Sequence, residues 1–132
     1  MTHIEHLCAP AGMRPGFGYS HAVKATGRLV AIAGQVAMDE DGELVGPDDP
    51  AAQAAQVFEN MRLALDAAGA TFADVVKLGI FVTDISILPV VREARDRHVD
   101  TAHPPASTAV QVVALFRPGY VVEVEALAVV AD

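Results

Sequence analysis

Two glutamates near the C-terminus, Glu123 and Glu125, are the residues best suited by type and spacing to do chemistry. Side chains two positions apart on a strand share a face and lie roughly 6.5–7 Å apart along it. In a partly desolvated site, one of these carboxylates could act as a general acid or base or position a water molecule. The alternatives are a solvated strand face, or a salt bridge to Lys24, Lys77 or Arg28.

Histidine, cysteine and glycine motifs in the first 20 residues predict no metal or dinucleotide site. His3 and His6 would point to opposite faces of a strand, so we do not expect them to share a metal ion. Cys8 has no basic neighbour in sequence, which favours a structural thiol over a nucleophile. The glycine loop at 16–19 lacks the strand and helix that flank a dinucleotide-binding loop.

Hydrophobic periodicity predicts six strands and two helices, in the order strand-strand-strand-helix-strand-helix-strand-strand. The expected strands span 1–8, 20–25, 28–36, 75–83, 106–115 and 120–130, and the expected helices span 50–68 and 86–100. Asp49 can cap the first helix, and Pro50 suits its first position because no N–H is needed there. The strands on either side of Thr26–Gly27 are expected to pair as a hairpin.

The alternation of the last strand predicts two different sheet faces. Two helices can cover only one face of a six-stranded mixed sheet, so the other face must meet solvent or another subunit. The apolar face, which suits the helices, consists of Val122, Val124, Ala126, Ala128 and Val130. The opposite face consists of Val121, Glu123, Glu125, Leu127 and Val129. This mixture favours a subunit interface that holds a polar pocket.

Length, charge and cysteine content restrict the class of protein. The 132 residues predict a single domain over 1–132, and 52% of them are hydrophobic. The net charge of −8 and the nine scattered basic residues argue against nucleic-acid binding. One cysteine allows no internal disulfide, and neither a signal peptide nor a membrane-spanning run is recognisable. We therefore expect a cytoplasmic protein that does not bind membranes.

Six stretches in the same order and spacing resemble the RidA/YjgF family of reactive-intermediate (enamine/imine) deaminases. They are G-Y-S-H-A-V at 18–23, I-A-G-Q-V at 32–36, Q-V-F-E-N-M at 56–61, V-V-K-L-G-I-F-V-T-D at 75–84, P-P-A-S-T-A-V-Q-V at 104–112 and V-E-V-E-A-L-A at 122–128. The resemblance implies an α+β, chorismate-mutase-like (RidA-like) fold. It also implies a homotrimer with small-molecule clefts between its subunits.

The same resemblance implies an activity and a set of site residues. Deaminases of this family hydrolyse 2-imino acids to 2-keto acids and ammonia, without a metal or a cofactor. By their positions in the motifs, Glu125 would position or activate water, and Tyr19 and the Gly34–Gln35 turn would line the cleft. The role of Glu123 is left open.

The chain departs from this pattern at the entry to the fifth strand. The family's deaminases read P-A-R-S-T or similar there, whereas this chain has Ser107 in place of the arginine that binds the substrate carboxylate. A serine donates one neutral hydrogen bond and cannot supply the charge-assisted pair. Arg14 is the best-placed replacement by sequence and Arg92 the second, unless both are surface arginines.

Two functions from different classes are therefore compatible with the sequence. The first is cofactor-free hydrolysis of an imine, enamine or related reactive metabolite. Glu125 would handle water in this reaction, and Tyr19, Ser107 and Thr108 would contact the substrate. The second is a non-catalytic trimer that binds a small metabolite as a sensor. A ribonuclease, sometimes ascribed to relatives, fits poorly with the charge of −8.

Overall fold

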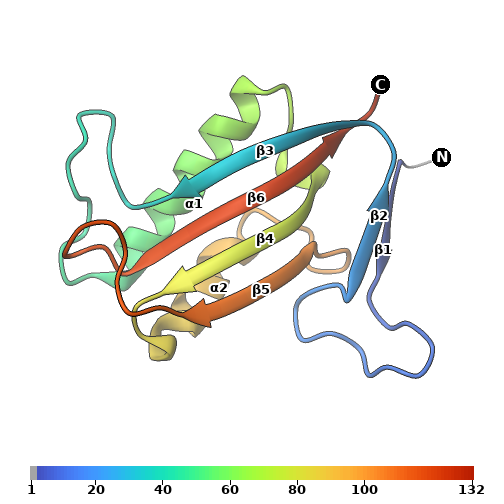
Figure 1. Cartoon of the computed structure of the whole chain (residues 1–132), viewed down its shortest axis with the longest axis horizontal. Coiled ribbons are helices and arrows are strands. Elements are labelled where there is room, and N and C mark those ends of the chain that lie inside the picture. The colour runs from blue at the N-terminus through green and yellow to red at the C-terminus, as the bar shows by residue number, and fades with distance from the viewer. Residues whose placement is uncertain (1–2) are drawn as a thin grey trace.

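The computed structural model of the chain describes residues 3–132 (Figure 1). Its strands are β1 (Ile4–Leu7), β2 (Ala22–Ala25), β3 (Arg28–Gln35), β4 (Val75–Val82), β5 (Ala106–Gln111) and β6 (Val122–Val130). Its helices are α1 (Pro50–Ala67) and α2 (Leu88–Asp96), with short 3-10 turns η1 (Phe72–Asp74) and η2 (Ile85–Ile87). The predicted order of strands and helices, and the α+β class, are confirmed.

The six strands form two sheets, so the prediction of a single six-stranded sheet was wrong. The larger sheet is mixed and has the order β3-β6-β4-β5, in which only β4 and β5 are parallel. The remaining strands, β1 and β2, form a separate antiparallel pair. Both sheets are visible in Figure 1, with the small pair lying beside the larger sheet.

The predicted hairpin at Thr26–Gly27 was also wrong, because the strands on either side pair with other partners. β2 pairs with β1, and β3 pairs with β6. Gly27 has a φ of 144°, and a Cβ there would collide with the backbone oxygen of Val130. Thr26–Gly27 is therefore a corner at which the chain passes from one sheet to the other.

Helix α1 forms as its sequence predicts. The Asp49 side chain caps it by accepting a hydrogen bond from the Ala52 N–H at 3.1 Å, and Pro50 occupies the first turn. One stripe of the helix is buried, namely Gln53, Ala54, Val57, Phe58, Met61 and Leu65. It packs on the predicted apolar face of β6, whose Val122, Val124, Ala126 and Ala128 are buried.

Helix α2 is shorter than the predicted span of 86–100. The Asp84 side chain accepts a hydrogen bond from the Ser86 N–H and caps the turn η2, after which the α-helix begins at Leu88 with Pro89 in its first turn. The helix ends at Asp96, and a loop that closes with Pro104 and Pro105 leads to β5.

Both helices lie on the same side of the larger sheet, as predicted (Figure 1). The opposite face, which we call the open face, is covered by no helix. It leaves large apolar side chains exposed, including Leu29 (69%), Val110 (41%) and Leu127 (41%). No helix within residues 3–132 combines the length and the apolar character needed to cross a membrane.

Candidate functional site

A cavity lies where β3 ends, beside β6 and α1. Its volume is about 880 Å³, which suits a small molecule. Three of the residues discussed from sequence border it: Gly34, Gln35 and Glu123. The rest of its wall is Val36, Met38, Asp39, Glu40, Gln56, Asn60, Leu63 and Phe116.

Gly34 makes room for the Glu123 side chain. The pairing of β3 with β6 shifts between Ile32 and Gln35, a bulge that brings Gly34 against Glu123. A Cβ at Gly34 would collide with Oε2 of Glu123 and lie 2.8 Å from its Cδ. Only a residue without a side chain therefore fits here while Glu123 keeps this rotamer.

Glu125 lies two residues along β6, on the same side of the sheet as Glu123. It packs over Gly79, where an added Cβ would lie 2.9 Å from its Cγ. Glu125, Glu123 and Phe116 border a smaller hollow of about 460 Å³. Because Glu123 and Phe116 also border the large cavity, the two spaces adjoin.

The cations considered as partners for this glutamate pair have other partners. Lys24 pairs with Glu5 at 3.2 Å, and Arg28 pairs with Asp132 at 3.9 Å. The Nζ atom of Lys77 donates to Oγ1 of Thr108 at 2.8 Å. The interpretation of Glu123 and Glu125 as salt-bridged surface residues therefore loses its support.

Helix α1 and the loop before β6 complete the cavity. Asn60 donates from Nδ2 to the carbonyl oxygens of Val36 and Met38, at 3.1 and 2.8 Å, which fastens the chain after β3 to α1. Gln56 donates to Oδ1 of Asn60 at 2.8 Å. The Phe116 ring stacks on Tyr120, with centroids 5.3 Å apart. Sequence reasoning did not single out Gln56, Asn60 or Phe116, although the two amides stand four residues apart beside the buried stripe of α1.

Tyr19 and Arg14 lie together in the N-terminal loop, away from the residues that border the two cavities. Arg14 donates from Nη2 to the Tyr19 hydroxyl at 3.1 Å, and its guanidinium lies 4.3 Å from the centroid of the Phe17 ring. The Tyr19 ring also meets His21 edge-on at 5.4 Å. Arg92, the second replacement considered, is exposed on α2.

Ser107 and Thr108 start β5 and face opposite sides of the larger sheet. Ser107 is paired with the buried Leu78, which puts it on the helix side. Thr108 is paired with Gly79, which in turn is paired with Glu125, so Thr108 shares the open face with that glutamate. The predicted site residues thus form separate groups within one chain.

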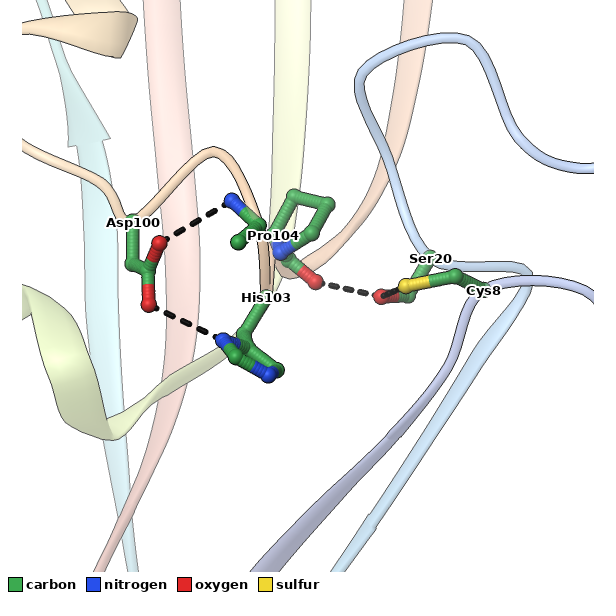
Figure 2. A network of polar contacts seen from close by, with 6 residues as sticks. Cys8, Ser20, Asp100, His103 and Pro104 are labelled. Atoms are coloured by element: carbon green, nitrogen blue, oxygen red, sulfur yellow. Dashed lines mark hydrogen bonds and ion pairs between the residues drawn. The ribbon is translucent and has the colours of Figure 1, made fainter.

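A polar network fixes the segment that precedes β5 (Figure 2). The Asp100 carboxylate accepts from the Ala102 N–H at 2.9 Å and is bonded to Nδ1 of His103 at 3.0 Å. The Ser20 hydroxyl donates to the Pro104 carbonyl oxygen and lies 3.2 Å from the Cys8 sulfur. The start of β5 is therefore held against the loop that carries Tyr19. Across residues 3–132, no three His, Cys, Asp or Glu side chains gather in a way that could hold a metal ion.

Comparison with known proteins agrees with this architecture. Residues 11–130 match the sequence model of the family described as Endoribonuclease L-PSP. The chain is 38% identical to Protein DfrA of Myxococcus xanthus, over 92% of this chain and 89% of that protein. It is also 38% identical to the 2-iminobutanoate/2-iminopropanoate deaminase of Bos taurus, over 96% of this chain and 88% of that enzyme.

Solved structures of relatives share the fold. The Rid-family protein YyfB of Yersinia pestis superposes with a TM-score of 0.85 at 37% identity, covering 98% of this chain and 100% of that one. RidA of Psychrobacter sp. superposes with a TM-score of 0.71 at 39% identity, with the same coverage. The family model, the relatives and the shared fold agree, and the chain belongs to the Endoribonuclease L-PSP family, also called the RidA/YjgF family.

Proposed function

We propose that the protein hydrolyses the carbon–nitrogen double bond of a small imine, or of the imine formed from an enamine, without a metal or cofactor. The observation that carries this proposal is the Glu123 carboxylate, seated against Gly34 in a cavity of about 880 Å³. The name of the Bos taurus relative, an iminobutanoate and iminopropanoate deaminase, supports the same reaction class.

The reaction needs one group that moves a proton to and from water. A carboxylate accepts a proton from the attacking water as the water oxygen bonds to the imine carbon, and the π electrons move onto nitrogen, which takes that proton from the carboxylic acid. The carboxylate then accepts the hydroxyl proton of this carbinolamine and passes it to nitrogen, as the carbon–nitrogen bond breaks and the carbonyl bond forms. The products are a carbonyl compound and ammonia.

Of the two candidate carboxylates, we assign the proton transfer to Glu123. The family resemblance points to Glu125, which borders only the smaller hollow. Glu123 borders both spaces, packs against Gly34 and shares the large cavity with Gly34 and Gln35, the turn expected to line the cleft. In this proposal Glu125 adds negative charge beside the substrate and does not contact the attacking water.

We also propose that the active assembly is a homotrimer, which would bring the separate groups of site residues together between chains. The exposed Leu29, Val110 and Leu127 on the open face support an interface there. Tyr19 would then line the cleft of a neighbouring subunit, with Arg14 bonded to its hydroxyl. We do not propose the nuclease activity in the family's name, because carboxylates on the cavity wall repel phosphates.

The test uses imines generated in the cuvette by flavin-dependent amine and amino-acid oxidases, with ammonia release followed during the first minute. We expect wild type to accelerate release over buffer for at least one imine, and Glu123→Gln to lose most of that acceleration. Glu125→Gln is the matched control and should retain more activity than Glu123→Gln. Failure of wild type to accelerate any imine would contradict the enzyme proposal and favour the metabolite-binding trimer.

A further inference from the structure

The charged side chains on the wall of the proposed site are all negative. The two adjoining cavities are bordered by four carboxylates, Asp39, Glu40, Glu123 and Glu125, each with a formal negative charge at pH 7. Among the described residues that border these cavities, none is a lysine, arginine or histidine. The remaining polar groups on the wall are the neutral amides Gln35, Gln56 and Asn60.

The nearby cations have other contacts. Lys77, whose pairing with Leu127 puts it on the open face like Glu125, donates to Oγ1 of Thr108 at 2.8 Å. Arg14 donates to the Tyr19 hydroxyl at 3.1 Å. Ser107, at the position of the family's arginine, is paired with the buried Leu78 on the helix side of the sheet. The buried Arg95 guanidinium bonds Asp96 at 2.9 Å, next to Gly18. The Arg117 guanidinium lies over the Phe116 ring at 5.1 Å from the centroid, but Arg117 does not border either cavity.

On the cavity wall of one chain, a substrate carboxylate would therefore meet like charge without a cation to pair with. Like charges held close together in a partly desolvated site repel, which is a common way to exclude a wrong ligand. A protonated imine carries the opposite charge and is attracted by the same wall. Protonation also makes the imine carbon more electrophilic, so the wall favours the form that water attacks.

We propose that the substrate of this site is an imine without a carboxylate, derived from a simple amine and bound as its iminium ion. This inference rests on the proposed imine hydrolysis and specifies its substrate class. The reaction is the addition of water to R–CH=NH₂⁺ to give R–CHO and NH₄⁺, so atoms and charge balance without a further reactant. The amides and the Phe116 ring suit an uncharged body for the R group.

A matched pair of substrates tests the charge requirement. 2-Phenylethylamine and L-phenylalanine differ only by a carboxylate, and flavin-dependent oxidases convert each to its imine in a rapid burst. We expect the protein to accelerate ammonia release from the amine-derived imine roughly tenfold or more over its effect on the imino acid, as one repelled charge in a binding site would give. Equal acceleration, or a preference for the imino acid, overturns the inference but leaves the proposed function standing.

Variants locate the effect in the cavity. Glu40→Gln and Asp39→Asn should raise KM for the amine-derived imine several-fold with little change in kcat, because each removes attraction for the bound cation. Asparagine keeps an oxygen to accept from the N–H groups of Asp41 and Glu43, which Asp39 now binds at 2.9 Å. Glu43→Gln removes an exposed charge outside the cavity and should leave KM unchanged.

The remaining outcomes also decide the matter. If the imino acid is hydrolysed and Arg117→Ala abolishes that hydrolysis, Arg117 anchors a carboxylate and the inference is wrong. If Glu40→Gln and Asp39→Asn leave KM unchanged, the wall charge does not select the substrate. If the protein hydrolyses neither imine faster than buffer does, both this inference and the proposed function are wrong. This result is recognisable because both rates equal the buffer rate.

Discussion

Two glycines determine where the two glutamate side chains of β6 can lie. Gly34 on β3 faces Glu123, and Gly79 on β4 faces Glu125. Neither glycine has a positive φ, so alanine is compatible with both backbones and only the added Cβ matters. An alanine at either glycine therefore displaces one carboxylate and leaves the glutamate itself in the sequence.

We predict that Gly34→Ala lowers imine hydrolysis strongly and that Gly79→Ala lowers it much less. The Cβ in the first variant takes the space of the Glu123 carboxylate and forces it into another rotamer. The Cβ in the second displaces only Glu125. The measurement is kcat for ammonia release, with urea unfolding of both variants as the folding control. A larger loss in Gly79→Ala would transfer the proton-moving role to Glu125.

Part of the site could be predicted from local pattern and part could not. Strand alternation placed Glu123 and Glu125 on one face that helices do not cover, and the structure agrees. That Glu123 meets Gly34 depends on the pairing of β3 with β6, which lie about 90 residues apart, and on a bulge in that pairing. Long-range register of this kind leaves no signal in a short window of sequence.

At the scale of the elements, Gln53 joins helix α1 to the loop that precedes it and to the loop before β6. It is fully buried and donates from Nε2 to the carbonyl oxygens of Gly46 and Gly119, at 3.1 and 2.8 Å. Its Oε1 accepts from the Val121 N–H at 3.0 Å, just before β6 begins. One side chain thus satisfies three backbone groups from separate segments.

We predict that Gln53→Leu destabilises the fold by about 2–4 kcal/mol, because buried backbone groups lose their hydrogen-bond partners. Gln56→Leu is the matched control on the same helix. Gln56 donates to another side chain, Asn60, and its replacement should cost less than about 1 kcal/mol. Urea unfolding followed by circular dichroism measures both. Equal losses would show that the backbone groups near Gln53 find other partners.

The elements show which sequence signals are reliable. Helix α1 begins and ends close to its predicted bounds because its signals are local, namely the Asp49 cap, Pro50 and the apolar stripe. The predicted hairpin was wrong because each strand pairs with one more distant in sequence, β2 with β1 and β3 with β6. A two-residue turn is compatible with a hairpin, but the pairing is decided by the rest of the sheet.

The pKa of His98, just beyond α2, makes the free energy of unfolding depend on pH. Its ring stacks on Phe58 and Phe72, with centroids 6.0 and 4.8 Å away. Burial lowers the pKa of His98, and the nearby charges of Arg62 and Arg97 lower it further. The negative charge of Glu59 partly offsets this lowering. The folded state therefore binds the proton less readily than the unfolded chain does. The resulting stability is fully present above about pH 6.5 and is lost as pH falls below that value.

We predict that the free energy of unfolding falls more between pH 7.5 and 5.5 in wild type than in His98→Gln. Glutamine does not titrate, so the variant lacks this contribution at both pH values. Burial and the nearby His103 also lower the pKa of His6. Because His6 is present in both proteins, its contribution cancels from the comparison. Urea unfolding at the two pH values gives the free energy of unfolding of each protein. An equal decrease in wild type and His98→Gln would contradict the prediction.

At the scale of the whole molecule, the open sheet face is the feature that a single chain does not explain. Leu29, Val110 and Leu127 are exposed on it, while the helices bury the other face. Apolar side chains on a continuous sheet surface are stabilised when a second surface covers them. Glu123 and Glu125 stand on this same face, and we therefore propose that assembly and activity are coupled.

We predict that Leu127→Glu converts a trimer into monomers and removes activity at the same time. The substitution puts a charge into the proposed apolar contact, where no solvent remains to stabilise it. Ala55→Glu, which adds the same charge on the exposed side of α1, should leave the assembly intact. Light scattering should give wild type and Ala55→Glu a mass three times that of the 13.8 kDa chain, and Leu127→Glu the mass of one chain. A monomeric wild type would contradict the intersubunit cleft, and a monomeric Leu127→Glu that hydrolyses imines normally would confine the site to one chain.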